Sequence, residues 1–164
     1  EDLYFEIIRK KTAVLIAACA ASGAASSGAP ESEEIKMKQF GEAVGIAFQI
    51  KDDLFDYFPG NKTGKPAGND IREKKVTLPL IHALKNCDNS EKRKILGIVK
   101  AKNQTAAQIA VVADFVKGKG GFEYSTQTMV EYKNKAMEIL DSYPESEARE
   151  ALRALVEYTT DREK

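Results

Sequence analysis

The sequence predicts an all-α protein. Apolar residues recur at helical spacing along most of the chain, and no segment alternates between apolar and polar residues as a half-buried strand does. Glycine and proline residues divide this pattern into separate segments, as they do between helices. With 164 residues, the chain is long enough for one helical domain around one core. We therefore expect a single domain over residues 1–164.

The first part of the chain contains two expected helices. One covers residues 2–21 and the other residues 31–57, and a loop rich in Ser, Gly and Ala separates them. In the second helix Gly41 and Gly45 lie four positions apart on one face. Small residues at this spacing let another helix approach closely, so we expect the second helix to be central and tightly packed.

The rest of the chain is expected to contain shorter helices. Residues 61–70 carry glycines, a proline and two lysines without hydrophobic periodicity, which predicts a loop. The helical pattern resumes over residues 71–84, where Pro79 permits a kink or a helix start. The remaining expected helices cover residues 90–102, 104–117, 121–142 and 145–161.

The composition argues against several classes of function. The 25 basic and 25 acidic residues give a formal net charge of zero, which favours neither nucleic acid nor an anionic membrane as a partner. No apolar run approaches the roughly 18 residues of a transmembrane span, and no signal peptide is recognised. Cys19 and Cys87 lie far from any Cys/His cluster and are expected to be buried thiols in a reducing compartment. A soluble cytoplasmic protein is expected.

The sharpest chemical feature is an acidic segment in the second helix, Gln49-Ile50-Lys51-Asp52-Asp53-Leu54-Phe55-Asp56. A helix places Asp52 and Asp56 one turn apart on one face, with Gln49 a further turn back. Like charges at this spacing destabilise an isolated helix by about 0.2–0.5 kcal/mol per pair, so a cation should offset them. Magnesium prefers such oxygen ligands. The alternative is a solvated acidic patch, against which the apolar neighbours of the carboxylates argue.

Basic residues near this segment indicate a ligand with phosphate oxygens. The glycine-containing loop carries Lys65, and Lys75 follows it. A flexible backbone with ammonium groups suits a polyphosphate, although an ordinary surface loop is the alternative. Lys11, which is followed by Thr12, opens an Ala-rich helix and taken alone is more typical of a solvated lysine.

Four segments together resemble the second half of the bacterial polyprenyl diphosphate synthases. They are Lys11-Thr12-Ala13, the segment at residues 45–57, Gly64-Lys65-Pro66-Ala67-Gly68-Asn69-Asp70 and Thr77-Leu78-Pro79-Leu80-Ile81. Their order and spacing match as well, and several linked motifs are far more specific than one aspartate-rich motif. The resemblance implies the C-terminal half of the isoprenoid synthase helical bundle, without the N-terminal half that holds the first aspartate-rich motif.

The resemblance implies a prenyltransferase that condenses an allylic diphosphate with isopentenyl diphosphate by magnesium-assisted ionisation, and that is a homodimer when complete. The implied magnesium ligands are Asp52, Asp53 and Asp56, with Asp52 the most direct. The implied catalytic residues are Lys11, Thr12, Gln49 and Asp52. The lysines implied to contact the diphosphate are Lys11, Lys65 and Lys75. His82 is expected to be a packed or partly exposed helix residue, not a base.

Because the first motif would lie upstream of Glu1, we expect a truncated chain that is inactive alone. Phe40, Val44 and Phe48 are then expected to have lost the helices that they packed against. Three alternatives remain. A noncatalytic subunit of a heteromeric synthase would commonly lose metal ligands that are intact here. Another class I terpenoid synthase would not explain the lysine-bearing loop. A plain helical interaction domain leaves the charged motifs unexplained.

Overall fold

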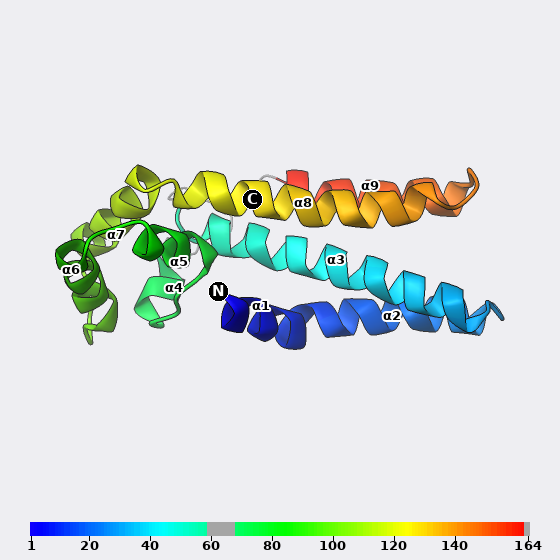
Figure 1. Cartoon of the computed structure of the whole chain (residues 1–164), viewed down its shortest axis with the longest axis horizontal. Coiled ribbons are helices and arrows are strands. Elements are labelled where there is room, and N and C mark those ends of the chain that lie inside the picture. Colours follow the sequence, from blue (N-terminus) through cyan, green and yellow to red (C-terminus); the bar gives the residue numbers. More distant parts are fainter. Residues whose placement is uncertain (59–67, 163–164) are drawn as a thin grey trace. The chain divides into compact units, whose positions relative to one another are not determined.

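The computed structural model describes residues 1–58 and 68–162, which form helices and connecting turns with no strand in those ranges (Figure 1). The predicted all-α class is confirmed. The elements are α1 (Asp2–Ile8), a π-helical segment η1 (Arg9–Ala13), α2 (Val14–Ser26), α3 (Glu31–Phe55), α4 (Asn69–Arg72), α5 (Leu78–Lys85), α6 (Asn89–Lys100), α7 (Ala106–Gly118), α8 (Gly121–Asp141) and α9 (Glu147–Asp161). None of these helices is both long and apolar enough to cross a bilayer.

The helix expected at residues 71–84 is replaced by two shorter helices. α4 ends at Arg72, and Lys74 adopts a φ of 60°, a left-handed conformation that a helix cannot continue through. Pro79 lies in the first turn of α5, where its missing N–H costs no hydrogen bond. The other expected helices are found within a few residues of their predicted ends, except that the first continues to Ser26.

The chain divides into two compact units, which we describe separately. Unit 1 contains residues 52–126 together with Glu1, and unit 2 contains residues 2–51 and 127–162. Each has a hydrophobic cluster of its own. The expectation of one domain over residues 1–164 stays a prediction.

The core of unit 2 joins α3 to α8 and α9. Its buried residues are Phe40, Ala43, Val44, Ala136, Leu140 and Val156. The expectation that Phe40 and Val44 have lost their packing partners is therefore wrong: each is only 4% exposed, because helices of the same chain cover it. Phe48 is half-buried, and the Arg162 guanidinium carbon lies 4.4 Å from the centroid of its ring.

Two glycines bring α3 against the preceding helical segments, which lie beside it in Figure 1. A methyl group at Gly45 would lie 2.5 Å from the Ala13 Cα, and one at Gly41 would lie 2.7 Å from the Ala17 Cα. Both obstacles are backbone atoms, which cannot rotate away as a side chain can. The close helix approach predicted from the glycine spacing is confirmed.

The core of unit 1 is built mainly from α5, α6 and α7. Its buried members are Tyr57, Ile71, Leu80, Ala83, Leu84, Ile95, Val99, Ile109, Val112 and Val116. Both α6 and α7 begin with a capping box: the side chain of the residue before the helix, Asp88 or Thr105, accepts the backbone N–H of Glu91 or Gln108, and the Glu91 or Gln108 side chain accepts the backbone N–H of the capping residue. The expectation of two buried thiols is wrong, since Cys19 is exposed and Cys87 only partly buried.

An ion pair ties the end of α9 to α8 within unit 2. The Lys133 ammonium lies 2.9 and 3.0 Å from the two carboxylate oxygens of Asp161. This hydrogen bond lowers the pKa of Asp161 below its usual value. The Asp161 side chain is 65% exposed, so solvent screening keeps the pair weak.

The first prediction concerns the close approach at Gly45. Replacing Gly45 by alanine is expected to lower the free energy of unfolding by about 1–3 kcal/mol, because the added methyl group overpacks a backbone contact. Gly23 is the matched control, since it lies inside α2 with open space around it. Gly23→Ala is expected to stabilise the protein by about 0.5–1 kcal/mol. Urea unfolding measures both, and equal effects of the two substitutions would refute the packing role of Gly45.

The second prediction concerns the pair between Lys133 and Asp161. Because folding lowers the pKa of Asp161, the pair contributes stability above the unfolded pKa of about 3.9 and loses it as the pH falls through the folded pKa. Lys133→Met is expected to cost at most about 1 kcal/mol at pH 7 and progressively less as the pH falls below about 3.9. Thermal unfolding across this pH range, with the exposed Lys94→Met as control, tests it. A cost that persists unchanged at pH 2 would contradict the assignment.

Candidate functional site

The acidic segment lies at the C-terminal end of α3, against the local electrostatic preference. Helix C-termini carry partial negative charge, which makes a nearby carboxylate unfavourable by about 0.3–1 kcal/mol. The last turn of α3 nevertheless contains Asp52 and Asp53 and no basic residue. Asp53 is only 6% exposed, and Ile50 and Leu54 beside it are buried. A buried carboxylate in a negative field is the kind of local conflict that a functional site maintains.

Asp56 lies one residue past the end of α3, not within a helix as predicted. One of its carboxylate oxygens accepts the backbone N–H of Asn69 at 3.0 Å, and the other accepts that of Asp70 at 2.9 Å. The backbone carbonyl of Asp56 accepts the N–H of Gly68 at 2.7 Å. One residue therefore receives three consecutive backbone N–H groups at the start of α4.

Tyr57 and Lys75 extend this network within unit 1. The buried Tyr57 hydroxyl lies 3.2 Å from the Thr77 hydroxyl. Burial raises the pKa of Tyr57, and the charges of Asp70, Asp56 and Asp53 raise it further, so the phenol stays neutral. Lys75 is half exposed, and its ammonium lies 2.5 Å from Glu73 and 3.4 Å from Asp70. These contacts, Glu73 first, raise the pKa of Lys75 and keep it cationic.

In unit 2, Thr12 and Gln49 form a second polar contact. The Thr12 hydroxyl donates to the Gln49 side-chain oxygen at 2.8 Å in a partly buried position. Thr12 and the exposed Lys11 both belong to the π-helical segment η1. Segments of this kind are rare and occur frequently at functional sites. The sequence did not predict this segment, because a π-turn has no distinctive residue pattern.

The metal and diphosphate assignments stay predictions. Within residues 1–58 and 68–162, no group of three or more His, Cys, Asp or Glu side chains is gathered as a metal site. Asp52, Asp53 and Asp56 are thus not gathered as such a group in this part of the chain. Lys65 lies outside the described residues. His82 is partly exposed, and its ring stacks on Tyr124 with centroids 4.1 Å apart, so it is a packed helix residue as predicted.

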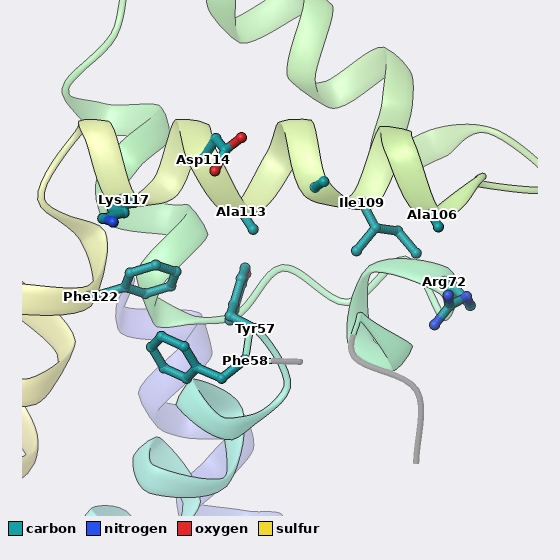
Figure 2. Close-up of a pocket in the computed structure, with 10 residues that line it drawn as sticks. Tyr57, Phe58, Arg72, Ala106, Ile109, Ala113, Asp114, Lys117 and Phe122 are labelled. Carbon is teal, nitrogen blue, oxygen red and sulfur yellow. The ribbon is translucent and has the colours of Figure 1, made fainter. Parts of the chain in front are cut away.

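Unit 1 also contains an apolar cavity that the sequence did not predict. Its volume is about 530 Å³, and Figure 2 shows Tyr57, Phe58 and Phe122 facing α7 across it. The other lining residues are Arg72, Ala106, Ile109, Ala110, Ala113, Asp114 and Lys117. Its lining comes from segments that are separate in the sequence, which is why periodicity alone cannot reveal it.

The third prediction tests the contact between Thr12 and Gln49. Thr12→Val keeps the shape of the side chain but leaves the Gln49 oxygen without this donor, and is expected to cost about 0.5–1.5 kcal/mol of stability. Thr12→Ser keeps the hydroxyl and should cost less. Urea unfolding of both variants, combined with Gln49→Leu in a double-mutant cycle, isolates the pair. Additive effects of Thr12→Val and Gln49→Leu would contradict the interaction.

The chain matches a known protein family and several of its members. Residues 1–116 match the family model described as polyprenyl synthetase. The chain is 40% identical over 158 residues to heptaprenyl diphosphate synthase component 2 of Geobacillus stearothermophilus, covering 94% of this chain and 48% of the relative. It is 33% identical over 164 residues to the short chain isoprenyl diphosphate synthase of Methanothermobacter thermautotrophicus, covering 99% of this chain and 50% of the relative.

Solved structures of prenyl synthases have a similar fold over the length of this chain. Geranylgeranyl pyrophosphate synthase from Bacteroides thetaiotaomicron superposes with a TM-score of 0.90 at 43% identity, covering 99% of this chain and 54% of that one. Polyprenyl synthase from Caulobacter crescentus superposes with a TM-score of 0.91 at 33% identity, covering all of this chain and 50% of that one. The chain thus spans about half the length of the proteins that it matches. The predicted fold and resemblance are confirmed, and the chain belongs to the polyprenyl synthetase family.

Proposed function

We propose that the protein acts in a trans-prenyltransferase that condenses an allylic diphosphate with isopentenyl diphosphate to form a longer polyprenyl diphosphate. The observation that carries this proposal is the acidic end of α3, where Asp52 and the nearly buried Asp53 lie without a basic residue in the last turn. The relatives support the substrate class, because they are named isoprenyl and heptaprenyl diphosphate synthases. We also propose that the complete enzyme is a homodimer and is located in the cytoplasm.

Asp52 and Asp53 would hold a divalent metal, for which we propose magnesium. Their oxygen donors suit a hard cation, and magnesium commonly binds through one or two carboxylates together with substrate phosphates. The Caulobacter crescentus structure is a complex with calcium and isoprenyl diphosphate. A bound magnesium would offset negative charge on the diphosphate oxygens.

The lysines and the polar pair of unit 2 would act on the substrate itself. We assign Lys11, Lys65 and Lys75 to diphosphate oxygens, because an ammonium stabilises the charge that appears when the allylic C–O bond breaks. The oxygens of Thr12 and Gln49, joined by their hydrogen bond, would face the positive charge that develops on the allylic carbon. The isopentenyl double bond then forms the new C–C bond, and the released diphosphate removes the proton. No protein nucleophile takes part.

A second candidate is a subunit of a two-component synthase. It is favoured by the relative from Geobacillus stearothermophilus, which is named component 2 of its enzyme. The two candidates differ in whether the protein alone makes product. Activity of the purified protein without any partner supports the single-component enzyme, and activity that depends on an added second protein supports the subunit.

The fourth prediction tests the acidic end of α3. Asp52→Asn keeps the size of the side chain but removes its charge, and in the complete protein it is expected to lower the turnover rate about 100-fold or more. Incorporation of radiolabelled isopentenyl diphosphate, measured across magnesium concentrations, provides the test. The control is Glu138→Gln, which removes an exposed carboxylate on α8 and should leave the rate unchanged. Equal rates for Asp52→Asn and the wild type would refute the proposed role.

A further inference from the structure

The three aspartates of the acidic segment are not equivalent in their surroundings. Asp52 and Asp53 belong to the last turn of α3, whereas Asp56 follows the helix. We propose that Asp56 is a positioning residue, which holds the start of α4 and thereby places Lys75, and that it is not a direct metal ligand. The proposal rests on the proposed function for the metal and the diphosphate.

The hydrogen bonds of Asp56 show what its carboxylate does. The first N–H groups of a helix have no partner within the helix, and a carboxylate is a strong acceptor for them. Both oxygens of Asp56 are used in this way, toward Asn69 and Asp70, at 3.0 and 2.9 Å. Asp56 therefore caps α4 from a position 13 and 14 residues upstream. A cation coordinated to either oxygen would have to share that oxygen with a backbone N–H and would lie close to its partly positive hydrogen.

Gly68 adds a third hydrogen bond between Asp56 and the start of α4. Its N–H donates to the Asp56 carbonyl, and its φ of 82° is a left-handed conformation that favours glycine. A methyl group on Gly68 would lie 2.4 Å from the Ile109 Cγ2, inside the core of unit 1. The chain thus passes between Asp56 and Ile109 with room for glycine only. We call the three bonds from residues 68–70 to Asp56 the clasp.

The clasp connects Asp56 to Lys75 through Asp70. The backbone N–H of Asp70 is bound by Asp56, its carbonyl accepts the N–H of Lys75 at 2.8 Å, and its carboxylate lies 3.4 Å from the Lys75 ammonium. Ile71 anchors the same stretch in the core with no exposed surface. Loss of the clasp should displace Lys75, which we assign to diphosphate binding, while leaving Asp52 and Asp53 on α3.

The test compares Asp56→Asn, Gly68→Ala and Asp52→Asn in the intact protein. Asparagine turns an N–H donor toward one of the two backbone N–H groups, and Gly68→Ala disturbs the clasp without touching a carboxylate. Both are expected to speed amide hydrogen exchange at Asn69 and Asp70 about tenfold or more. Both should also weaken binding of inorganic diphosphate at saturating magnesium by about three- to tenfold. A purely structural role would leave diphosphate binding unchanged.

The magnesium dependence separates positioning from direct ligation. Titration of magnesium at saturating inorganic diphosphate should give midpoints within about twofold of the wild type for Asp56→Asn and Gly68→Ala, and a midpoint raised about tenfold or more for Asp52→Asn. The proposal is wrong if Asp56→Asn shifts this midpoint as Asp52→Asn does, or if amide exchange or diphosphate binding is unchanged. If Asp56→Asn does not fold, the same measurements on Gly68→Ala test the proposal. An unchanged magnesium midpoint in Asp52→Asn contradicts the proposed function instead. In that case the amide exchange rates of Asn69 and Asp70 still test whether Asp56 holds the start of α4.

Discussion

The concentration of negative charge at the C-terminal end of α3 is the constraint on which the site depends. Carboxylates here lie at the negative end of the helix dipole, which destabilises their charge, and burial of Asp53 removes most of the water that would solvate it. Carboxylates in such a place need hydrogen-bond donors or positive charge beside them. For Asp56 the structure shows the donors, since two backbone N–H groups of α4 bind its oxygens. Asp52 and Asp53, in the last turn of α3, are the carboxylates that we propose as ligands of a metal ion, which would in turn bind the diphosphate.

The proposed division of roles fits the arrangement of the segment after α3. At Gly68 the chain adopts a left-handed conformation, donates its N–H to the Asp56 carbonyl and packs against Ile109. The neighbouring Tyr57 stays neutral, because burial and the surrounding carboxylates raise its pKa, and it can bond the Thr77 hydroxyl without adding charge. A neutral Tyr57 thus satisfies the Thr77 hydroxyl without adding its own negative charge to those of Asp53, Asp56 and Asp70.

In unit 2, two glycines set the distance between α3 and the helical segments before it. Gly41 and Gly45 allow backbone-to-backbone contact between α3 and the helical segment before it, and this contact sets where Thr12 can meet Gln49. A hydrogen bond of 2.8 Å between residues 37 positions apart depends on that close approach. The glycines therefore matter to the proposed chemistry indirectly, by fixing the distance between the helices that carry the polar pair.

The sequence by itself determined the all-α class, the order of most helices, the acidic segment and the family, because helical periodicity and linked motifs are local patterns. It also placed Gly41 and Gly45 at a close contact. Only the tertiary structure decided that α8 and α9 cover Phe40 and Val44, and that Asp56 binds the start of α4. Both depend on contacts between residues far apart in the chain. A local pattern shows which groups need partners, whereas the fold decides which partners they meet.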